Sequence, residues 1–171
     1  HCFYQLKQTP QQHIDVITRE VENAVAAGLT VNLYLEDWSN GMKNSYNYVY
    51  NMMDSLRHLP IKRFMLPDTL GVLNPYDTLA HVQRMIKRYP ELHFDFHAHN
   101  DYDLATSNVY AAVLGGAKGV HCTVNGLGER AGNACLSSVV ALIHDQLQRE
   151  TGVDETKINK VSRIVESFSG V

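Results

Sequence analysis

The sequence has few cysteines and no long apolar run, and both absences restrict what the chain can be. Its 171 residues include three cysteines, Cys2, Cys122 and Cys135. An odd number without metal-ligand spacing predicts neither a disulfide framework nor a zinc ribbon, and it favours a reducing compartment. No apolar stretch approaches the roughly 20 residues that a membrane span needs, and no signal-like segment opens the chain. We therefore expect a cytoplasmic protein without a membrane partner.

Clustered positive charge is also missing. The net charge is -3 and the basic residues are scattered along the chain, a pattern that offers no electrostatic footprint for nucleic acid. Because 44% of the residues are hydrophobic, the chain can bury the core of one domain, and we expect a small-molecule partner. The sequence begins at His1 without a methionine and ends at "ESFSGV", so we expect a fragment of a longer chain.

Helix and strand patterns alternate along the sequence. Thr9, Pro10 and Gln12 form a helix-start signature, and a first helix is predicted from there to Gly28. Strands are predicted at residues 30–37, 63–67, 92–98 and 119–124, and further helices at about 44–58, 75–89 with Asn74 as N-cap, 103–114, 133–149 and 154–168. Strand starts recur about every 30 residues, the length of one βα unit. The fold class expected is α/β, a parallel (β/α) TIM-barrel type with four units present.

Three of the predicted strands alternate polar and apolar side chains. The polar sets are Asn32, Tyr34 and Glu36; His93, Asp95, His97 and His99; and His121, Thr123 and Asn125. Parallel strands covered by helices are usually apolar on both faces. We therefore expect the polar sides to gather in a barrel lumen near the active-site mouth. An antiparallel sheet with one wet face would also alternate, but the intervening helices disfavour it.

Two histidines stand two residues apart in "FHAHND", residues 96–101. Side chains at i and i+2 of a strand point the same way, about 6.5 to 7 Å apart, so His97 and His99 can converge on one ion. Two imidazoles leave room for a carboxylate and open positions, a pattern typical of catalytic metal sites. Alternatively, each histidine is an interior hydrogen-bonding group.

Three glycines are spaced through "NGLGERAGN", residues 125–133, before a predicted helix. Such a loop can present backbone N–H groups to an anion or close on a ligand. The alternative is a flexible turn in which Asn133 is the helix N-cap and Glu129 and Arg130 form a solvated pair.

In this order and spacing, "YLEDW", "LPDTLG", "FHAHND" and "NGLGERAGN" resemble the second half of the catalytic barrel of the isopropylmalate, homocitrate and citramalate synthase family, which is related to hydroxymethylglutaryl-CoA lyase. The resemblance runs over nearly the whole chain. It implies that residues 1–171 are the C-terminal half of a (β/α)8 catalytic barrel plus a following helix. It also implies a parent acyltransferase that condenses acetyl-CoA with 2-oxoisovalerate or pyruvate in leucine or isoleucine biosynthesis. A divalent metal ion, Zn2+, Mg2+ or Mn2+, would be the cofactor.

The resemblance also implies roles for individual residues. His97, His99 and Asn133 would bind the metal, and Thr69 would hydrogen-bond the carboxylate of the oxo acid while Glu36 orients the substrate. Tyr34, two residues before Glu36 on the same strand face, is expected to project into the lumen, where the branched-chain synthases of this family commonly carry a smaller residue. A ring there favours pyruvate over 2-oxoisovalerate. Asp103 stands where the family commonly has glycine, which leaves the backbone shape of that loop open.

Part of the family's machinery lies outside these residues: an Arg-Asp pair whose Asp is the third metal ligand, and segments that bind the thioester. We therefore expect the isolated chain to be inactive and to form a homo-oligomer through its open sheet edges. One alternative is a lyase or metal aldolase, although such lyases usually carry a cysteine-bearing glycine loop where this chain has "GLGERAGN". The other alternative is a non-catalytic, self-associating half barrel.

Overall fold

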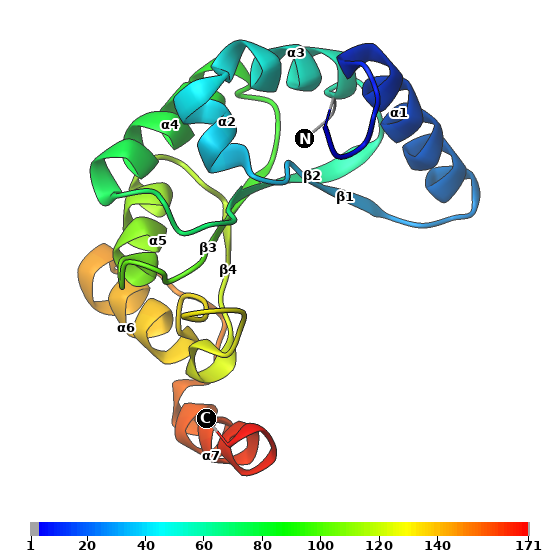
Figure 1. The fold of residues 1–171 in the computed structure, drawn as a ribbon. Coiled ribbons are helices and arrows are strands. Elements are labelled where there is room, and N and C mark those ends of the chain that lie inside the picture. Colours follow the sequence, from blue (N-terminus) through cyan, green and yellow to red (C-terminus); the bar gives the residue numbers. More distant parts are fainter. Residues whose placement is uncertain (1–3, 171) are drawn as a thin grey trace.

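In the computed structural model, which describes residues 4–170, one curved parallel sheet carries helices on its convex side (Figure 1). The strands are β1 (Val31–Tyr34), β2 (Ile61–Asp68), β3 (Phe94–Ala98) and β4 (Gly119–His121), and they lie in the order β1-β2-β3-β4. Each neighbouring pair is parallel and consecutive in sequence. The predicted α/β fold is therefore confirmed, and the sheet is part of a barrel.

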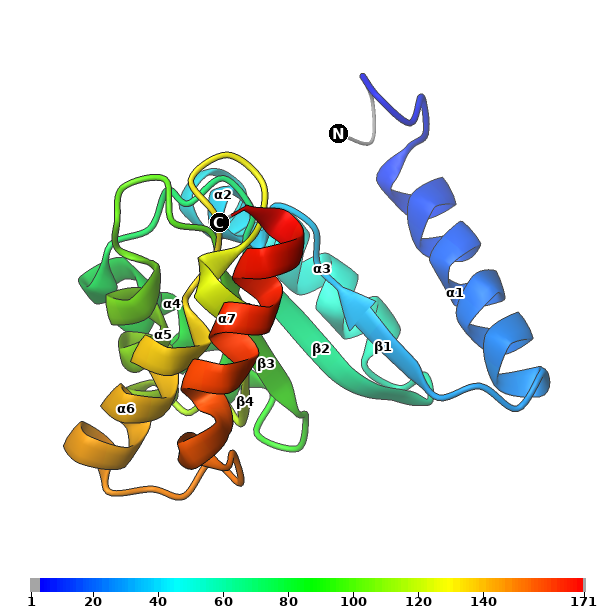
Figure 2. The ribbon, with the colours of Figure 1, turned by 90° about the horizontal axis from the view of Figure 1, so that it is seen from below.

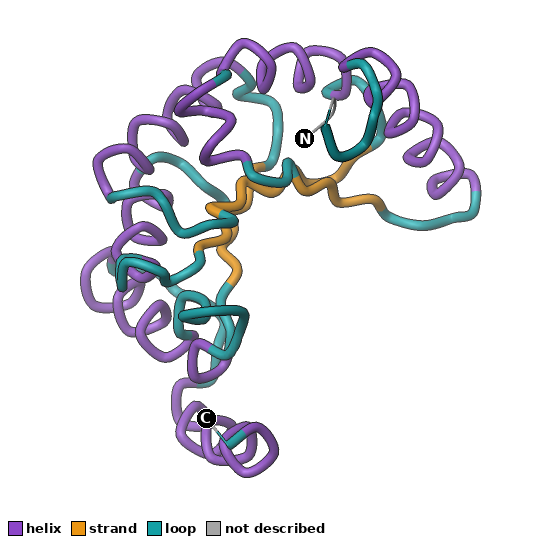
Figure 3. The backbone as a smooth tube through the Cα atoms, in the orientation of Figure 1, coloured by secondary structure: helices purple, strands orange, loops and turns teal. Residues whose placement is uncertain are grey.

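Helices lie along the outer side and at the two ends of the arc that the strands form (Figure 3). They are α1 (Pro10–Ala26), α2 (Trp38–Asn44), α3 (Tyr46–Leu56), α4 (Pro75–Arg88), α5 (Ala105–Leu114), α6 (Leu136–Leu147) and α7 (Ile158–Ser169), with short 3-10 turns η1 (Val124–Gly126) and η2 (Glu155–Lys157). Figure 2 shows α1 set apart from the group of α4, α5 and α6. No helix within residues 4–170 is long and apolar enough to cross a membrane.

Local capping signals fix two of the helix starts as predicted. The Thr9 hydroxyl accepts from the Gln12 N–H at 3.2 Å, and the Gln12 side chain accepts from the Thr9 N–H at 2.9 Å, which completes a capping box. Asn74 caps α4 by accepting from the Asp77 N–H at 3.0 Å. These bonds satisfy N–H groups that the first helical turn leaves unpaired.

The region after β1 differs from the prediction. The strand predicted at 30–37 ends at Tyr34, because Asp37 takes a left-handed conformation with a φ of 59° and begins α2 as its N-cap. The helix predicted at 44–58 is α3, whereas α2 precedes it in a segment where no helix was predicted, and Ser45 separates the two. A side chain at Gly41 would come within 2.8 Å of a Val49 methyl group, so glycine allows the two helices to approach closely.

Other predicted boundaries also shift. The fourth strand stops at His121 instead of residue 124, where the chain turns into η1. The helix predicted from Asn133 begins at Leu136 with Cys135 as N-cap, so the alternative in which Asn133 is the helix N-cap is wrong. The last predicted helix, 154–168, consists of η2 followed by α7. Cys122 and Cys135 are free thiols, whereas Cys2 and the outermost ends of the predicted domain lie outside the described residues.

The core lies between the convex face of the sheet and the helices. Its buried members from the strands are Phe64, Leu66, Phe94, Phe96 and Ala98, and those from the helices include Trp38, Met53, Leu56, Val82, Met85 and Val109. Trp38 packs edge-on against Phe96, with ring centroids 6.5 Å apart. This apolar layer leaves the opposite, concave face of the sheet for polar side chains.

Candidate active site

Polar side chains from three strands meet on the concave face. The Tyr34 hydroxyl on β1 and the Nδ1 atom of His121 on β4 share a hydrogen bond of 2.7 Å. The ring centroid of His97 on β3 lies 6.5 Å from that of Tyr34 and 5.9 Å from that of His121. The predicted convergence of the polar strand faces is confirmed for these residues.

Asp95 is the buried anchor of this face, with only 1% of its surface exposed. Its carboxylate accepts from Arg63 at 3.2 Å and pairs with His93 Nε2 at 2.8 Å, and His121 Nε2 lies 3.4 Å away. A side chain at Gly119, its partner on β4, would collide with the carboxylate. A buried carboxylate needs charged or hydrogen-bonding partners of this kind. The sequence features that point to this buried Asp95 are the polar alternation of β3 and the glycine opposite it on β4.

His97 and His99 lie side by side, with ring centroids 5.0 Å apart and planes at 88°. The Nδ1 atoms of both are buried and have no hydrogen-bond partner among the described residues. Burial, together with the nearby His99 and His121 rings, lowers the pKa of His97 to about 4. His97 is therefore neutral near pH 7, the form in which an imidazole binds a metal ion.

Asn133 is brought to the histidines by the backbone. It forms an antiparallel bridge with His99, and the Asn100 N–H donates to the neighbouring Gly132 carbonyl at 2.9 Å. The Asn133 side-chain NH2 donates to the Leu127 carbonyl at 3.1 Å, which leaves its Oδ1 atom buried and without a hydrogen-bond partner in residues 4–170. Since buried polar atoms are nearly always satisfied, the three predicted ligands fit a divalent cation.

The described part of the chain does not contain a metal site built from histidine, cysteine and carboxylate side chains alone. Within residues 4–170, no three His, Cys, Asp or Glu side chains form a group that could hold a metal ion. His97, His99 and the Asn133 oxygen would therefore need a further ligand from outside this set. The roles assigned to all three remain predictions.

The glycine loop shapes the position of Asn133. Gly126 and Gly132 have φ angles of +69° and +86°, and a side chain at Gly128 would collide with the Asn133 amide. The N–H groups of Leu127, Gly132 and Asn133 donate to carbonyls within residues 124–129. These three N–H groups are thus used inside the loop, and they do not form the anion cradle that the spacing suggested.

Thr69 connects the loops that follow β1 and β2. Its hydroxyl oxygen accepts from the Asp37 N–H at 3.0 Å. A hydroxyl that accepts one bond still has its proton to donate, so Thr69 keeps a donor for a further partner.

Glu36 lies in the exposed turn after β1, and among the described residues it makes no hydrogen bond or ion pair.

Burial raises the pKa of Tyr34, and the negative charges of Asp95 and Glu36 raise it further. The phenol of Tyr34 therefore keeps its proton at neutral pH.

Arg130 joins three loops, a role that the sequence did not reveal. Its Nε and Nη2 atoms donate to the two Asp101 carboxylate oxygens at 2.7 and 2.9 Å, and Nη2 also donates to the Thr69 carbonyl at 2.8 Å. The alternative of a solvated Glu129–Arg130 pair is therefore wrong. Asp101 fits tightly, because a side chain at Gly71 would lie 2.6 Å from its carboxylate. The sequence feature that could have predicted this contact is the presence of an aspartate in "HND" and an arginine in "GER".

The loop after β3 keeps a glycine-like shape without a glycine. Asp103 has a φ of 57°, in the left-handed region that aspartate tolerates better than most residues. Its carboxylate accepts from the Asn100 side chain at 3.1 Å, which supports this conformation.

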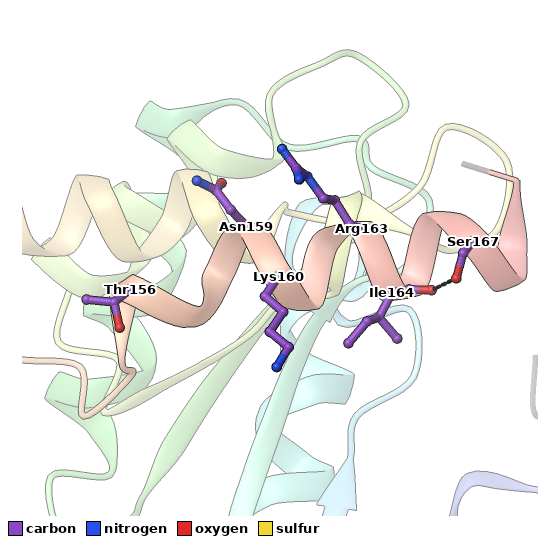
Figure 4. Close-up of a pocket in the computed structure, with 6 residues that line it drawn as sticks. All are labelled: Thr156, Asn159, Lys160, Arg163, Ile164 and Ser167. Carbon is purple, nitrogen blue, oxygen red and sulfur yellow. Dashed lines mark hydrogen bonds between the residues drawn. The ribbon is translucent and has the colours of Figure 1, made fainter.

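A separate hollow of about 480 Å³ lies along α7 (Figure 4). It is lined by Thr156, Asn159, Lys160, Arg163, Ile164 and Ser167. Asn159 and Arg163 point to one side of the helix and Lys160 to the other, so these groups do not converge on a ligand. None of the predicted site residues lines this hollow.

Comparison with known proteins gives a consistent result. The model of a family described as HMGL-like matches residues 1–165. A putative (R)-citramalate synthase of Methanopyrus kandleri is 34% identical over 172 residues, which is 100% of this chain and 33% of that protein. A 2-isopropylmalate synthase of Sulfurisphaera tokodaii is 34% identical over 171 residues, 100% of this chain and 44% of that protein. The homocitrate synthase of Saccharolobus solfataricus is 35% identical over 168 residues, 96% of this chain and 35% of that protein. The chain thus spans less than half the length of these curated relatives.

Solved structures share the fold. The HMG-CoA lyase of Bacillus subtilis superimposes with a TM-score of 0.84 at 21% identity, covering 98% of this chain and 59% of the lyase. The Acinetobacter baumannii HMG-CoA lyase, solved with coenzyme A and 3-methylmalate, gives a TM-score of 0.79 at 22% identity over 98% of this chain and 57% of that one. At this identity the likeness shows the fold alone.

Proposed function

The chain belongs to the HMGL-like family, and on that basis we propose that it is part of the catalytic barrel of a synthase that condenses acetyl-CoA with a 2-oxo acid. Its curated relatives are citramalate, isopropylmalate and homocitrate synthases. The observation that carries the proposal is the group of unpaired buried atoms on His97, His99 and Asn133 beside a polar sheet face.

His97, His99 and Asn133 would hold a divalent ion, Zn2+, Mg2+ or Mn2+. When bound, such an ion supplies a Lewis acid that polarises the carbonyl of a 2-oxo acid. The chain's own contribution is to hold two imidazoles and one amide oxygen at the mouth of the barrel. The low pKa of His97 keeps it in the binding form without competition from protons at neutral pH.

Thr69 and Glu36 would act on the substrate. The Thr69 hydroxyl proton donates to the carboxylate of the oxo acid, and the hydroxyl is held in place by the Asp37 N–H on one side and, through the Thr69 carbonyl, by Arg130 on the other. Glu36 orients the substrate from the exposed turn after β1. Holding a substrate in one orientation removes rotational freedom that the reaction would otherwise lose at the barrier.

Tyr34 would limit the side chain of the oxo acid. Its ring stands edge-on to His97, with centroids 6.5 Å apart, so a large acyl substituent beside the metal ligands would meet the ring. Sequence identity does not separate the candidates, because the citramalate and isopropylmalate synthases both match at 34%. The ring favours pyruvate, and hence citramalate as the product in isoleucine biosynthesis.

The rest of the longer protein would supply what this chain lacks. A further metal ligand and the thioester-binding segments would come from outside residues 1–171, so the isolated chain would be inactive and would associate through its sheet edges. A lyase activity is less well supported, because the lyases match at 21% and 22% identity and the loop "GLGERAGN" contains no cysteine.

Thiol release from acetyl-CoA tests this function directly. The full-length protein should release coenzyme A when pyruvate is added, more slowly with 2-oxoisovalerate, and not without an oxo acid. Thr69→Val keeps the shape of the side chain and removes its donor, so it should raise the KM for the oxo acid about tenfold or more, as expected for the loss of a hydrogen bond to a charged group. Release that does not depend on an oxo acid would contradict the proposal.

A further inference from the structure

Tyr34 is more restrained than its exposure suggests. The side chain is 48% exposed on an edge strand, yet its hydroxyl is bonded to His121 Nδ1 at 2.7 Å. The two rings also contact each other, with centroids 5.7 Å apart. The bond joins residues 87 positions apart, so it connects β1 directly to β4 across the concave face.

His121 is itself held from the other side. Its Nε2 atom lies 3.4 Å from an Asp95 carboxylate oxygen. Asp95 is almost fully buried, and Arg63 and His93 fix its position at 3.2 and 2.8 Å. A continuous line of contacts thus runs from a rigid carboxylate on β3 through an imidazole on β4 to the phenol on β1.

We propose that His121 and Asp95 are positioning residues that hold the Tyr34 ring against His97 and thereby set the size of oxo acid that the site accepts. The inference rests on the proposed function. An untethered tyrosine could rotate away from a larger substrate, whereas this ring must first break its bond to His121. His121 does not touch the substrate in this account, and it acts through Tyr34.

The test is a pair of single variants and their combination in the full-length protein. Tyr34→Phe keeps the ring and removes the hydroxyl, whereas His121→Leu removes the partner nitrogen. Each should lower the ratio of kcat/KM for pyruvate to that for 2-oxoisovalerate by about tenfold, the low end of what a pocket wall contributes. The double variant should show no further loss, because both changes break the same bond.

His144→Leu is the matched control. His144 is also a histidine beside a carboxylate, with its Nδ1 atom 3.1 Å from an Asp145 oxygen, but it lies on α6 and is not bonded to Tyr34. In this control variant the ratio of kcat/KM for pyruvate to that for 2-oxoisovalerate should stay as in the wild type. A purely structural role for His121 would instead lower turnover with both acids equally and leave the ratio unchanged.

The outcomes separate the inference from the proposed function. Turnover with an unchanged ratio in Tyr34→Phe and His121→Leu would overturn the positioning role alone. Additive effects in the double variant would also overturn it, since the two residues would then act independently. Absence of thiol release with either acid in the wild type would overturn the proposed function and the positioning role with it.

Discussion

The two faces of the sheet come from the same strands but carry different side chains, apolar on the convex face and polar on the concave face. On the convex face, Phe64, Phe94 and Phe96 are each at most 1% exposed and pack against helices. On the concave face, Tyr34 and His121 are bonded to each other, and beside them the buried Asp95 is held by Arg63 and His93. Alternate residues of one strand point to opposite faces of the sheet, so the same strands supply the packed core on one face and the polar side chains on the other.

The buried histidines His81 and His97 have different surroundings. His81 on α4 is 8% exposed and has both ring nitrogens unpaired among the described residues, as it packs edge-on against Trp38. Burial lowers the pKa of His81, as it does for His97. His97 differs because His99 and, through the backbone bridge, Asn133 lie next to it. An unpaired imidazole is thus no metal site by itself, and the neighbours make the difference.

The largest expected effect breaks the convex face. Phe96→Ala should lower the free energy of unfolding by about 3–5 kcal/mol, because it opens a cavity in a packed core. Tyr34→Ala, an aromatic truncation on the concave face, should cost about 1 kcal/mol, roughly the net value of one hydrogen bond. Urea unfolding followed by circular dichroism would measure both. Equal losses of unfolding free energy in the two variants would show that the convex face does not contribute more to stability than the concave face.

A smaller effect concerns pH and the concave face. In the metal-free protein the pKa of His97 is about 4, against about 6.5 in an unfolded chain. Below pH 6.5 His97 is protonated in the unfolded state but stays neutral in the folded state. The free energy of unfolding should therefore fall as the pH drops from about 6.5 to about 4. After discounting for solvent screening we expect a loss of about 1–2 kcal/mol from this residue.

Urea unfolding at a series of pH values would check the pH effect. His97→Gln should flatten the decline by the amount assigned to His97. An identical pH dependence in wild type and His97→Gln would rule out the account of His97.

The smallest effect on global stability is expected at Arg130. The Arg130–Asp101 pair is partly exposed, 38% and 25% by side chain, so Arg130→Ala should lower the free energy of unfolding only slightly. The loop at residues 125–133 should nevertheless exchange its amide hydrogens faster, since its ties to Asp101 and the Thr69 carbonyl are lost. Glu129→Ala is the neighbouring control and should leave exchange unchanged. Unchanged exchange in Arg130→Ala would show that the loop is held by other contacts.

Local patterns predicted much of the fold, and long-range contacts account for what they missed. The starts at Thr9 and Asn74 follow from side-chain caps a few residues away, and the closeness of His97 and His99 follows from strand geometry. The end of β1 was missed, because the left-handed turn at Asp37 leaves no periodic signal. The Arg130–Asp101 and Tyr34–His121 bonds span 29 and 87 residues, and no local period encodes such pairs. The place of Asn133 beside the histidines came from family resemblance alone.

The most direct test is the metal content of the full-length protein after purification with a divalent ion and removal of the excess. We expect one ion per barrel in the wild type and in His81→Gln, whose imidazole is buried but alone. His97→Ala combined with His99→Ala should retain none, because two of the proposed protein ligands are lost. Circular dichroism should show that all three proteins are folded. One tightly bound ion in the double variant would contradict the proposal that these histidines form the metal site.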